Sequence, residues 1–348
     1  MRLRALSAAT SATSAAVLLL GSLQLAGCDR LPAAQAAARP VPAALGSEAL
    51  CAAGAGLPAG WGRQKQAGMA WIPPGNFTLG SQQGYADERP ATASQAVAGF
   101  WMDQTEVSNA QFAAFVHATG YVTQAEQEGG AVVFHQPTQE ELARRPYAWW
   151  SYVKGADWRH PTGPASGAPP GNTPVTMVTQ ADALAYARWL GRDLPTEAEW
   201  EYAAKAGRSD AELDKAPVDS QRRPTANYWQ GAFPLLNTQQ DRHAGLAPVG
   251  CYQANAFALY DMIGNAWEWT RDAYSGAHQA HANGDTAAVA AAARPGTPPR
   301  PDQPMVIKGG SFLCSPDFCV RYRASAREAQ EADLGAAHIG FRTVLRGS

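Results

Sequence analysis

The feature that most limits the possible fold of this chain is its few short helix signals, which are separated by long stretches rich in turn residues. Each signal pairs a Ser or Thr N-cap with a polar or acidic side chain three residues later, ahead of an apolar stripe. The pairs are Ser108 with Gln111, Thr179 with Asp182, and Thr196 with Glu199. Gly191 and Gly207 are placed to end the last two helices. The chain also contains 33 Gly, 25 Pro and 11 Trp. We therefore predict a single compact α+β domain with little regular secondary structure.

Two other segments guide the expected topology. In residues 69–81, apolar positions alternate around Pro73-Pro74-Gly75, which predicts a β-hairpin. Residues 273–304 are low in complexity and rich in Ala and Pro, so we expect a surface loop there.

The first 28 residues have the pattern of a secretory signal. Arg2 and Arg4 precede a short apolar run at 15–20, and Leu25-Ala26-Gly27-Cys28 follows. The run is shorter than the roughly 20 apolar residues of a membrane-spanning helix. Its ending resembles a bacterial lipobox, whose cysteine is lipidated; an ordinary cleaved signal peptide is the alternative. We expect a protein on the periplasmic side of a bacterial cell envelope, anchored to the membrane by lipid at Cys28.

The rest of the chain divides by composition. Residues 29–60 are rich in Ala and Pro, which favours a flexible tether over a short Ala helix. Residues 61–348 are expected to form the folded domain. A net charge of −2 with 17% charged residues gives no basic surface for nucleic acid, which we exclude as a partner.

The five cysteines suit an oxidising compartment. If Cys28 carries lipid, four remain, and four cysteines allow three pairings. The simplest joins Cys51 to Cys251 and leaves Cys314 and Cys319 as a local pair.

That local pair is the most informative part of the sequence. Four residues separate Cys314 from Cys319, and Pro316 favours a turn between them, so the two sulfurs can meet. A structural disulfide, a redox-active pair and a Cu(I) site are all consistent with this spacing, and the disulfide is the ordinary expectation in an exported protein. Zinc would need four ligands, and no second Cys/His pair is spaced to supply them.

From about Met69 to Arg346 the chain resembles the formylglycine-generating enzyme family, also called sulfatase-modifying factors. The matching motifs run in order and include "IPPGNFTLGS", "FWMDQTEVSNAQFAAFV", "LPTEAEWEYAAKAG", "ANYWQGAFPLLNT", "YDMIGNAWEWTRD" and "GGSFLCSPDFCVRYRASAR". Several of these occur across the wider superfamily, whereas the cysteine pair marks the oxidase branch. The resemblance implies a formylglycine-generating-enzyme fold, a variant of the C-type-lectin fold.

The resemblance also implies an activity. Cys314 and Cys319 would hold Cu(I), and a cysteine of an unfolded sulfatase-type polypeptide, in a Cys-x-Pro-x-Arg motif, would be oxidised by O2 to the aldehyde formylglycine. Ser311 and Trp267 match positions that line the oxygen and substrate pocket, although core packing explains Trp267 equally well. His338 stands in a "HIGFR" sequence where relatives carry Asn, so it either contacts the pocket or only packs.

Two structural calcium sites are implied in the same way. The first set of ligands is Asp261 and Glu268 through side chains with Gly264 and Ala266 through carbonyls. The second set is Asn227 and Asp241 through side chains with Tyr228 and His243 through carbonyls. Oxygen donors of this kind suit Ca²⁺, while turn capping by the same acids is the alternative. Asp261 stands where relatives frequently carry Asn.

Other interpretations remain. Glu197, Glu199 and Glu201 suit the first turns of a helix better than a general acid and base. The whole chain could instead be a non-catalytic envelope lipoprotein on the same scaffold, or a related oxidase of a small molecule such as a siderophore precursor.

Overall fold

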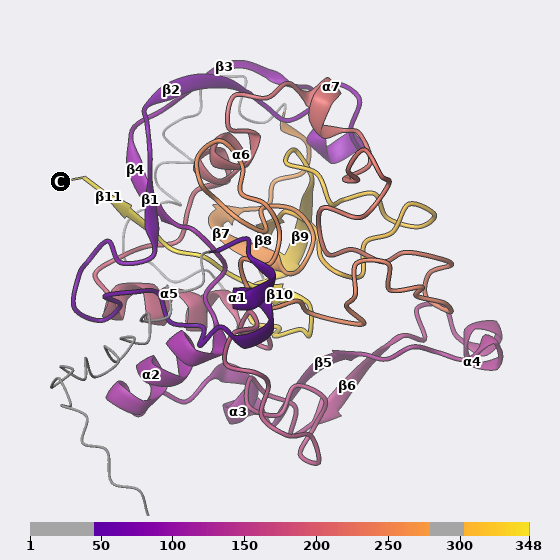
Figure 1. The fold of residues 1–348 in the computed structure, drawn as a ribbon. Coiled ribbons are helices and arrows are strands. Elements are labelled where there is room, and N and C mark those ends of the chain that lie inside the picture. The colour runs from indigo at the N-terminus through magenta and orange to yellow at the C-terminus, as the bar shows by residue number, and fades with distance from the viewer. Residues whose placement is uncertain (1–44, 279–302, 348) are drawn as a thin grey trace, which may run out of the picture. The chain divides into compact units, whose positions relative to one another are not determined.

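The computed structural model describes residues 45–278 and 303–347 (Figure 1). The predicted signal, residues 1–28, and the first half of the predicted tether lie outside these residues, as does most of the loop predicted at 273–304. Within the described ranges, no helix is long and apolar enough to cross a membrane.

The elements are short, as the sequence predicted. The helices are α1 (Glu48–Ala53), α2 (Asn109–Thr119), α3 (Gln124–Glu128), α4 (Gln139–Arg144), α5 (Gln180–Trp189), α6 (Glu197–Lys205) and α7 (Asp210–Leu213), with a 3-10 turn at Ala86–Glu88. The strands are β1 (Met69–Ile72), β2 (Gly75–Leu79), β3 (Thr92–Val97), β4 (Phe100–Asp103), β5 (Gly130–Phe134), β6 (Trp150–Lys154), β7 (Trp267–Ala273), β8 (Pro304–Lys308), β9 (Arg327–Glu331), β10 (Ile339–Gly340) and β11 (Val344–Arg346). Figure 1 shows α4 at the far end of the β5–β6 hairpin.

The three predicted helix starts are confirmed as α2, α5 and α6. In each, the N-cap side chain accepts a hydrogen bond from the third helical amide, and the third side chain accepts one from the cap amide. Gly191 takes a left-handed φ of 67° just after α5. At the end of α6, Ala206 already adopts a left-handed φ of 45°, one residue before the predicted stop at Gly207.

The predicted hairpin at residues 69–81 is wrong. β1 pairs antiparallel with β4, and β2 pairs antiparallel with β3, so the two halves of that segment enter different sheets. The alternating pattern identified both strands, but their partners come from residues 92–103. β11 joins the other edge of β4.

A four-stranded sheet in the order β10-β7-β8-β9 forms the centre of the fold. β7 pairs with β10 in parallel, and β8 pairs antiparallel with both of its neighbours. Side chains alternate between the two faces of a sheet, so Trp267 and Trp269 of β7 lie on one face and Glu268 on the other. Behind the Glu268 face lies α6, whose Trp200 donates to the Glu268 carboxylate over 2.7 Å.

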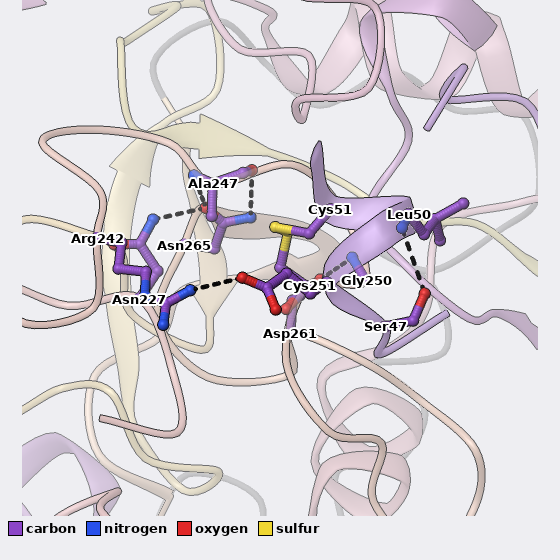
Figure 2. The surroundings of a disulfide bond; sticks show 11 residues. Ser47, Leu50, Cys51, Asn227, Arg242, Ala247, Gly250, Cys251, Asp261 and Asn265 are labelled. Atoms are coloured by element: carbon purple, nitrogen blue, oxygen red, sulfur yellow. Dashed lines mark hydrogen bonds and ion pairs between the residues drawn. A yellow bond between two sulfur atoms is a disulfide. The ribbon is translucent and has the colours of Figure 1, made fainter. Parts of the chain in front are cut away.

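The N-terminal helix α1 is attached to this body by a disulfide between Cys51 and Cys251, which confirms the predicted pairing (Figure 2). None of the residues of α1 is buried, and an amide hydrogen bond of 2.7 Å joins Gly46 to Gly250 beside the disulfide. The last part of the segment predicted as a tether, from residue 45 onward, is therefore folded.

Candidate active site

A pocket of about 380 Å³ opens on one face of the central sheet. Trp267 of β7, Ile307 of β8 and Glu328 of β9 line it together. They share a face because paired residues on neighbouring strands point to the same side of the sheet, as do alternate residues along one strand. The opposite face carries Glu268, Lys308 and Arg327, which are fully buried, so the sheet separates the pocket from a buried ionic network.

Cys314 and Cys319 lie at this pocket and are both free thiols. Their Sγ atoms are 3.8 Å apart. Reciprocal hydrogen bonds between the backbones of Ser315 and Cys319, of 3.1 and 3.0 Å, close a tight turn through Pro316 that brings the sulfurs together. The turn predicted at Pro316 is confirmed, and in this structure the two sulfurs are not bridged.

The two thiols differ in their electrostatic surroundings. The hydrogen bond to Cys319 and burial both raise the pKa of Cys314. The same hydrogen bond lowers the pKa of Cys319 against the effect of burial, and the positive charge of Arg321 lowers it further. The thiolate is therefore favoured at Cys319, with the buried Cys314 thiol as its hydrogen-bond donor.

The loop before the cysteines depends on its two glycines. Gly310 has a left-handed φ of 76°, and a Cβ there would lie 2.6 Å from the carbonyl oxygen of Arg321. Only glycine allows this approach. The next residue, Ser311, is fully buried, lines the pocket, and accepts a 3.3 Å hydrogen bond from the Leu313 amide. The structure thus brings the predicted residues Ser311, Cys314 and Cys319 to one site.

Trp267 lies both in the hydrophobic core and at the pocket, so the two predicted interpretations are compatible. Its amide donates to the carbonyl of His338, which also lines the pocket. The His338 ring lies 4.7 Å from that of Trp150, and its Nδ1 has no hydrogen-bond partner among the described residues. Burial lowers the pKa of His338 to about 3, which keeps the ring neutral near pH 7.

Aromatic side chains from several segments of the chain complete the pocket, and the sequence analysis did not predict them. They are Tyr85, Tyr147, Trp149, Trp150, Phe233 and Phe318. Phe318 is 52% exposed at the tip of the cysteine turn, and its ring stacks on Phe233 with centroids 4.8 Å apart. These residues share no local motif, so the high Trp content was the sequence signal that indicated an aromatic pocket.

In the first predicted calcium set, Glu268 points from β7 to the sheet face opposite the pocket. Glu268 is fully buried and forms a bidentate ion pair with Arg342, with both N···O distances 2.7 Å. Because Trp200 also donates to Oε2, only Oε1 keeps a free lone pair. Asp261 accepts a hydrogen bond from the Gly250 amide through Oδ2, while its Oδ1 is buried with no hydrogen-bond partner in the described structure. Asp261 therefore has a free oxygen to bind a cation, whereas Glu268 would contribute mainly its negative charge.

The second predicted set has converging oxygens. The amide nitrogen of Gln230 donates both to the carbonyl of Tyr228 and to Oδ2 of Asp241, the latter over 2.8 Å. Two of the predicted ligand oxygens, the Tyr228 carbonyl and Asp241 Oδ2, therefore converge on one position, which the Gln230 amide nitrogen occupies. Asn227 lies beside them, hydrogen-bonded through its amide to Asn265 over 2.9 Å (Figure 2). His243, Cys51 and Cys251 also come together, but those two sulfurs are joined as the disulfide.

Comparison with known proteins identifies the family. Residues 55–346 match the sulfatase-modifying factor enzyme 1-like domain. The chain belongs to this family. It is 42% identical over 294 residues to the formylglycine-generating enzyme of Mycobacterium tuberculosis, covering 78% of this chain and 96% of the relative. The corresponding enzyme of Streptomyces coelicolor is 41% identical over 289 residues, covering 79% of this chain and 88% of the relative.

Two further similarities bear on fold and activity. A mouse protein named inactive C-alpha-formylglycine-generating enzyme 2 is 32% identical over 293 residues, covering 81% of this chain and 86% of the relative. The family fold thus also occurs in a protein named inactive. The solved structure of PvdO from Pseudomonas aeruginosa superposes with a TM-score of 0.55 at 22% identity, covering 80% of this chain and 94% of that one. Together with the family match, it confirms the predicted fold class.

Proposed function

We propose that this chain is a copper-dependent oxidase that converts a cysteine of a sulfatase-type polypeptide, in a Cys-x-Pro-x-Arg motif, to formylglycine with O2. The observation that carries the proposal is the unbridged pair Cys314 and Cys319, with sulfurs 3.8 Å apart in an aromatic pocket. The similarity to curated formylglycine-generating enzymes supports the reaction.

The donor set fits Cu(I). Two thiol sulfurs this close can contact one ion, and soft thiolates select Cu(I) over harder cations. When bound, the copper would supply the redox chemistry with dioxygen. Arg321 favours the Cys319 thiolate, which is the form that binds a metal.

The other pocket residues have roles in substrate binding. Trp267 and the aromatic wall would enclose the substrate cysteine and exclude water. The neutral ring of His338, with a free Nδ1, and the buried Ser311 hydroxyl would hydrogen-bond the substrate backbone. Phe318 and Phe233 form an exposed aromatic platform for its apolar side chains.

The electron count defines the co-reactant. Conversion of the substrate's methylene thiol and water to an aldehyde and hydrogen sulfide releases two electrons, whereas reduction of O2 to two waters takes four. A thiol reductant supplies the other two by forming a disulfide. The complete reaction therefore consumes one O2 and two thiols per aldehyde.

Calcium and location complete the proposal. We assign a structural role to Ca²⁺ at the two predicted sets, around Asp261 and around Asn227 and Asp241, where hard oxygen donors gather. We also place the chain at the periplasmic side of a bacterial envelope, with lipid on Cys28. The Cys51–Cys251 disulfide supports an oxidising compartment.

The test uses the reduced full chain with one equivalent of Cu(I). It is incubated in air and a thiol reductant with a Cys-x-Pro-x-Arg peptide, and the peptide mass is followed. We expect conversion to the aldehyde, with release of sulfide. Cys314→Ala and Cys319→Ala should each lose copper and all turnover.

Two controls sharpen this test. The double variant Cys51→Ala/Cys251→Ala removes two sulfurs outside the pocket and should still bind copper. A peptide with Ser in place of Cys should stay unchanged. If copper binds through Cys314 and Cys319 but the cysteine peptide is unchanged, the substrate is another molecule. If the reduced chain binds no copper, the oxidase proposal fails and the non-catalytic scaffold is favoured.

A further inference from the structure

Glu106 and Asp261 form a buried pair of acids outside the pocket that contains Cys314 and Cys319. Glu106 precedes α2 and is fully buried, and Asp261 is 7% exposed. Oε1 of Glu106 accepts a 2.9 Å hydrogen bond from Asn265, and Oδ2 of Asp261 accepts a 2.5 Å bond from Gly250. Among the described residues, the second oxygens of the carboxyls, Oε2 and Oδ1, accept no hydrogen bond from a donor group, and the two carboxyls lie within hydrogen-bonding reach of each other. Each carboxyl thus keeps one free oxygen in the interior.

The charges around this pair do not balance. Glu106, Asp261 and Glu268 all lie close enough to Arg342 to interact with its charge. Glu268 forms a bidentate ion pair with Arg342, which leaves the other two acids without a cation of their own among the described residues. Two adjacent buried carboxylates are costly unless a positive charge neutralises them.

The local backbone suits an oxygen-ligated ion. The loop that carries Asp261 turns sharply, with left-handed φ values at Asp261, Gly264 and Asn265 of 53°, 75° and 55°. Figure 2 shows Asp261 and Asn265 gathered beside the disulfide, with Gly250 donating to Asp261. A divalent ion that prefers six to eight oxygens, such as Ca²⁺, matches this chemistry better than a soft metal.

We propose that Glu106 is a direct ligand of the divalent cation held by Asp261. This inference rests on the calcium part of the proposed function and adds a ligand from the loop before α2, which is distant in sequence from Asp261. With Glu106, the site has two free carboxylate oxygens from two acids. It depends less on Glu268, whose oxygens are largely occupied by Arg342 and Trp200.

The experiment is a calcium titration of the chelator-treated full chain by isothermal calorimetry, followed by Tb³⁺ luminescence at the same sites. The wild-type chain should bind two ions. Glu106→Gln should weaken one site by roughly 30-fold or more and leave the other unchanged. Asp241→Asn is the matched variant for the second site and should weaken only that one. Asp261→Asn should weaken the same site as Glu106→Gln.

Each result has a definite meaning. If the wild-type chain binds two ions and Glu106→Gln binds both with unchanged affinity, Glu106 is not a ligand and this proposal fails alone. If the wild-type chain binds no Ca²⁺, the calcium part of the proposed function fails with it. Glu106→Asp keeps the charge on a shorter side chain; weakened binding at one site with native near-UV circular dichroism would attribute the loss to the ligand and not to unfolding.

Discussion

At the residue scale, the two pocket cysteines are chemically unequal. Cys314 is buried and its pKa is raised, whereas Cys319 is partly exposed and its pKa is lowered by Cys314 and Arg321. Alkylation requires the thiolate and access to it. In the reduced, copper-free chain, iodoacetamide should therefore modify Cys319 before Cys314, as followed by peptide mass mapping over time.

Arg321 provides the variant for this prediction. Arg321→Gln removes the positive charge that stabilises the Cys319 thiolate, so alkylation at pH 7 should slow by roughly several-fold. Arg144→Gln removes an exposed arginine that does not line the pocket and should leave the rate unchanged. Equal rates for the two cysteines, or faster reaction of Cys314, would show that the assigned asymmetry is incorrect.

The sequence predicted the site best where its residues lie in one motif. Ser311, Cys314 and Cys319 occupy a single loop, and Gly309-Gly310 and Pro316 explain how that loop turns. Tyr85, Tyr147 and Phe233, by contrast, come from separate segments that only the tertiary fold brings together. No local spacing marks them, so they could not be assigned without the structure.

At the scale of elements, α1, like α4 and α7, has no buried residues. It is held by the Cys51–Cys251 disulfide, an exposed ion pair between Glu48 and Arg242, and the backbone bond at Gly46. Exposed ion pairs contribute only about 0–1 kcal/mol. The disulfide is therefore the main attachment of this segment.

The double variant Cys51→Ala/Cys251→Ala tests this attachment. We expect faster amide hydrogen exchange at residues 45–54, because local opening no longer breaks a covalent link. Protection in the central strands β7 and β8 should persist. Loss of protection throughout the body would instead mean that the disulfide stabilises the whole domain, and mild reduction of the wild-type chain should reproduce whichever pattern is found.

The elements also show which parts of a fold can be predicted locally. The caps at Ser108, Thr179 and Thr196 were correct because an N-cap and its box lie within four residues. The hairpin predicted at Pro73-Pro74-Gly75 does not form, because β1 pairs with β4 and β2 pairs with β3. Strand pairing is decided by burial across the whole domain. It therefore cannot be deduced from alternation alone.

At the scale of the whole molecule, the central sheet joins two different environments. One face carries the pocket, and the other packs against α6 through buried charges. Glu201 of α6 lies between Lys308 of β8, at 2.8 Å, and Lys205, at 3.0 Å. All three side chains are nearly or fully buried. In a fold with short elements, such a network fixes α6 against the sheet. It thereby stabilises the strands whose opposite face lines the pocket.

This network makes a prediction about acid stability. Burial opposes ionisation of Glu201, but the charges of Lys308 and Lys205 outweigh it and lower the pKa below its ordinary value. A carboxyl with a lowered folded pKa stabilises the fold above its unfolded pKa of about 4.3, and that contribution is lost as pH falls through the folded pKa. Glu201→Gln leaves two buried lysines without this partner, so it should lower the free energy of unfolding by about 3–5 kcal/mol at pH 7.

The pH dependence distinguishes charge from packing. As pH falls below about 4.3, Glu201 is protonated first in the unfolded chain and then, at its lower folded pKa, in the native state. The difference in unfolding free energy between wild type and Glu201→Gln should therefore shrink as the pH falls through this range. Urea denaturation at several pH values from 7 to 3 measures it. Glu140→Gln, which breaks an exposed pair with Arg144, is the control and should change stability by less than about 0.5 kcal/mol throughout. A Glu201→Gln deficit that stays constant over this range would mean that Glu201 acts by packing and hydrogen bonding, because only an ionic contribution disappears when the carboxylate is protonated.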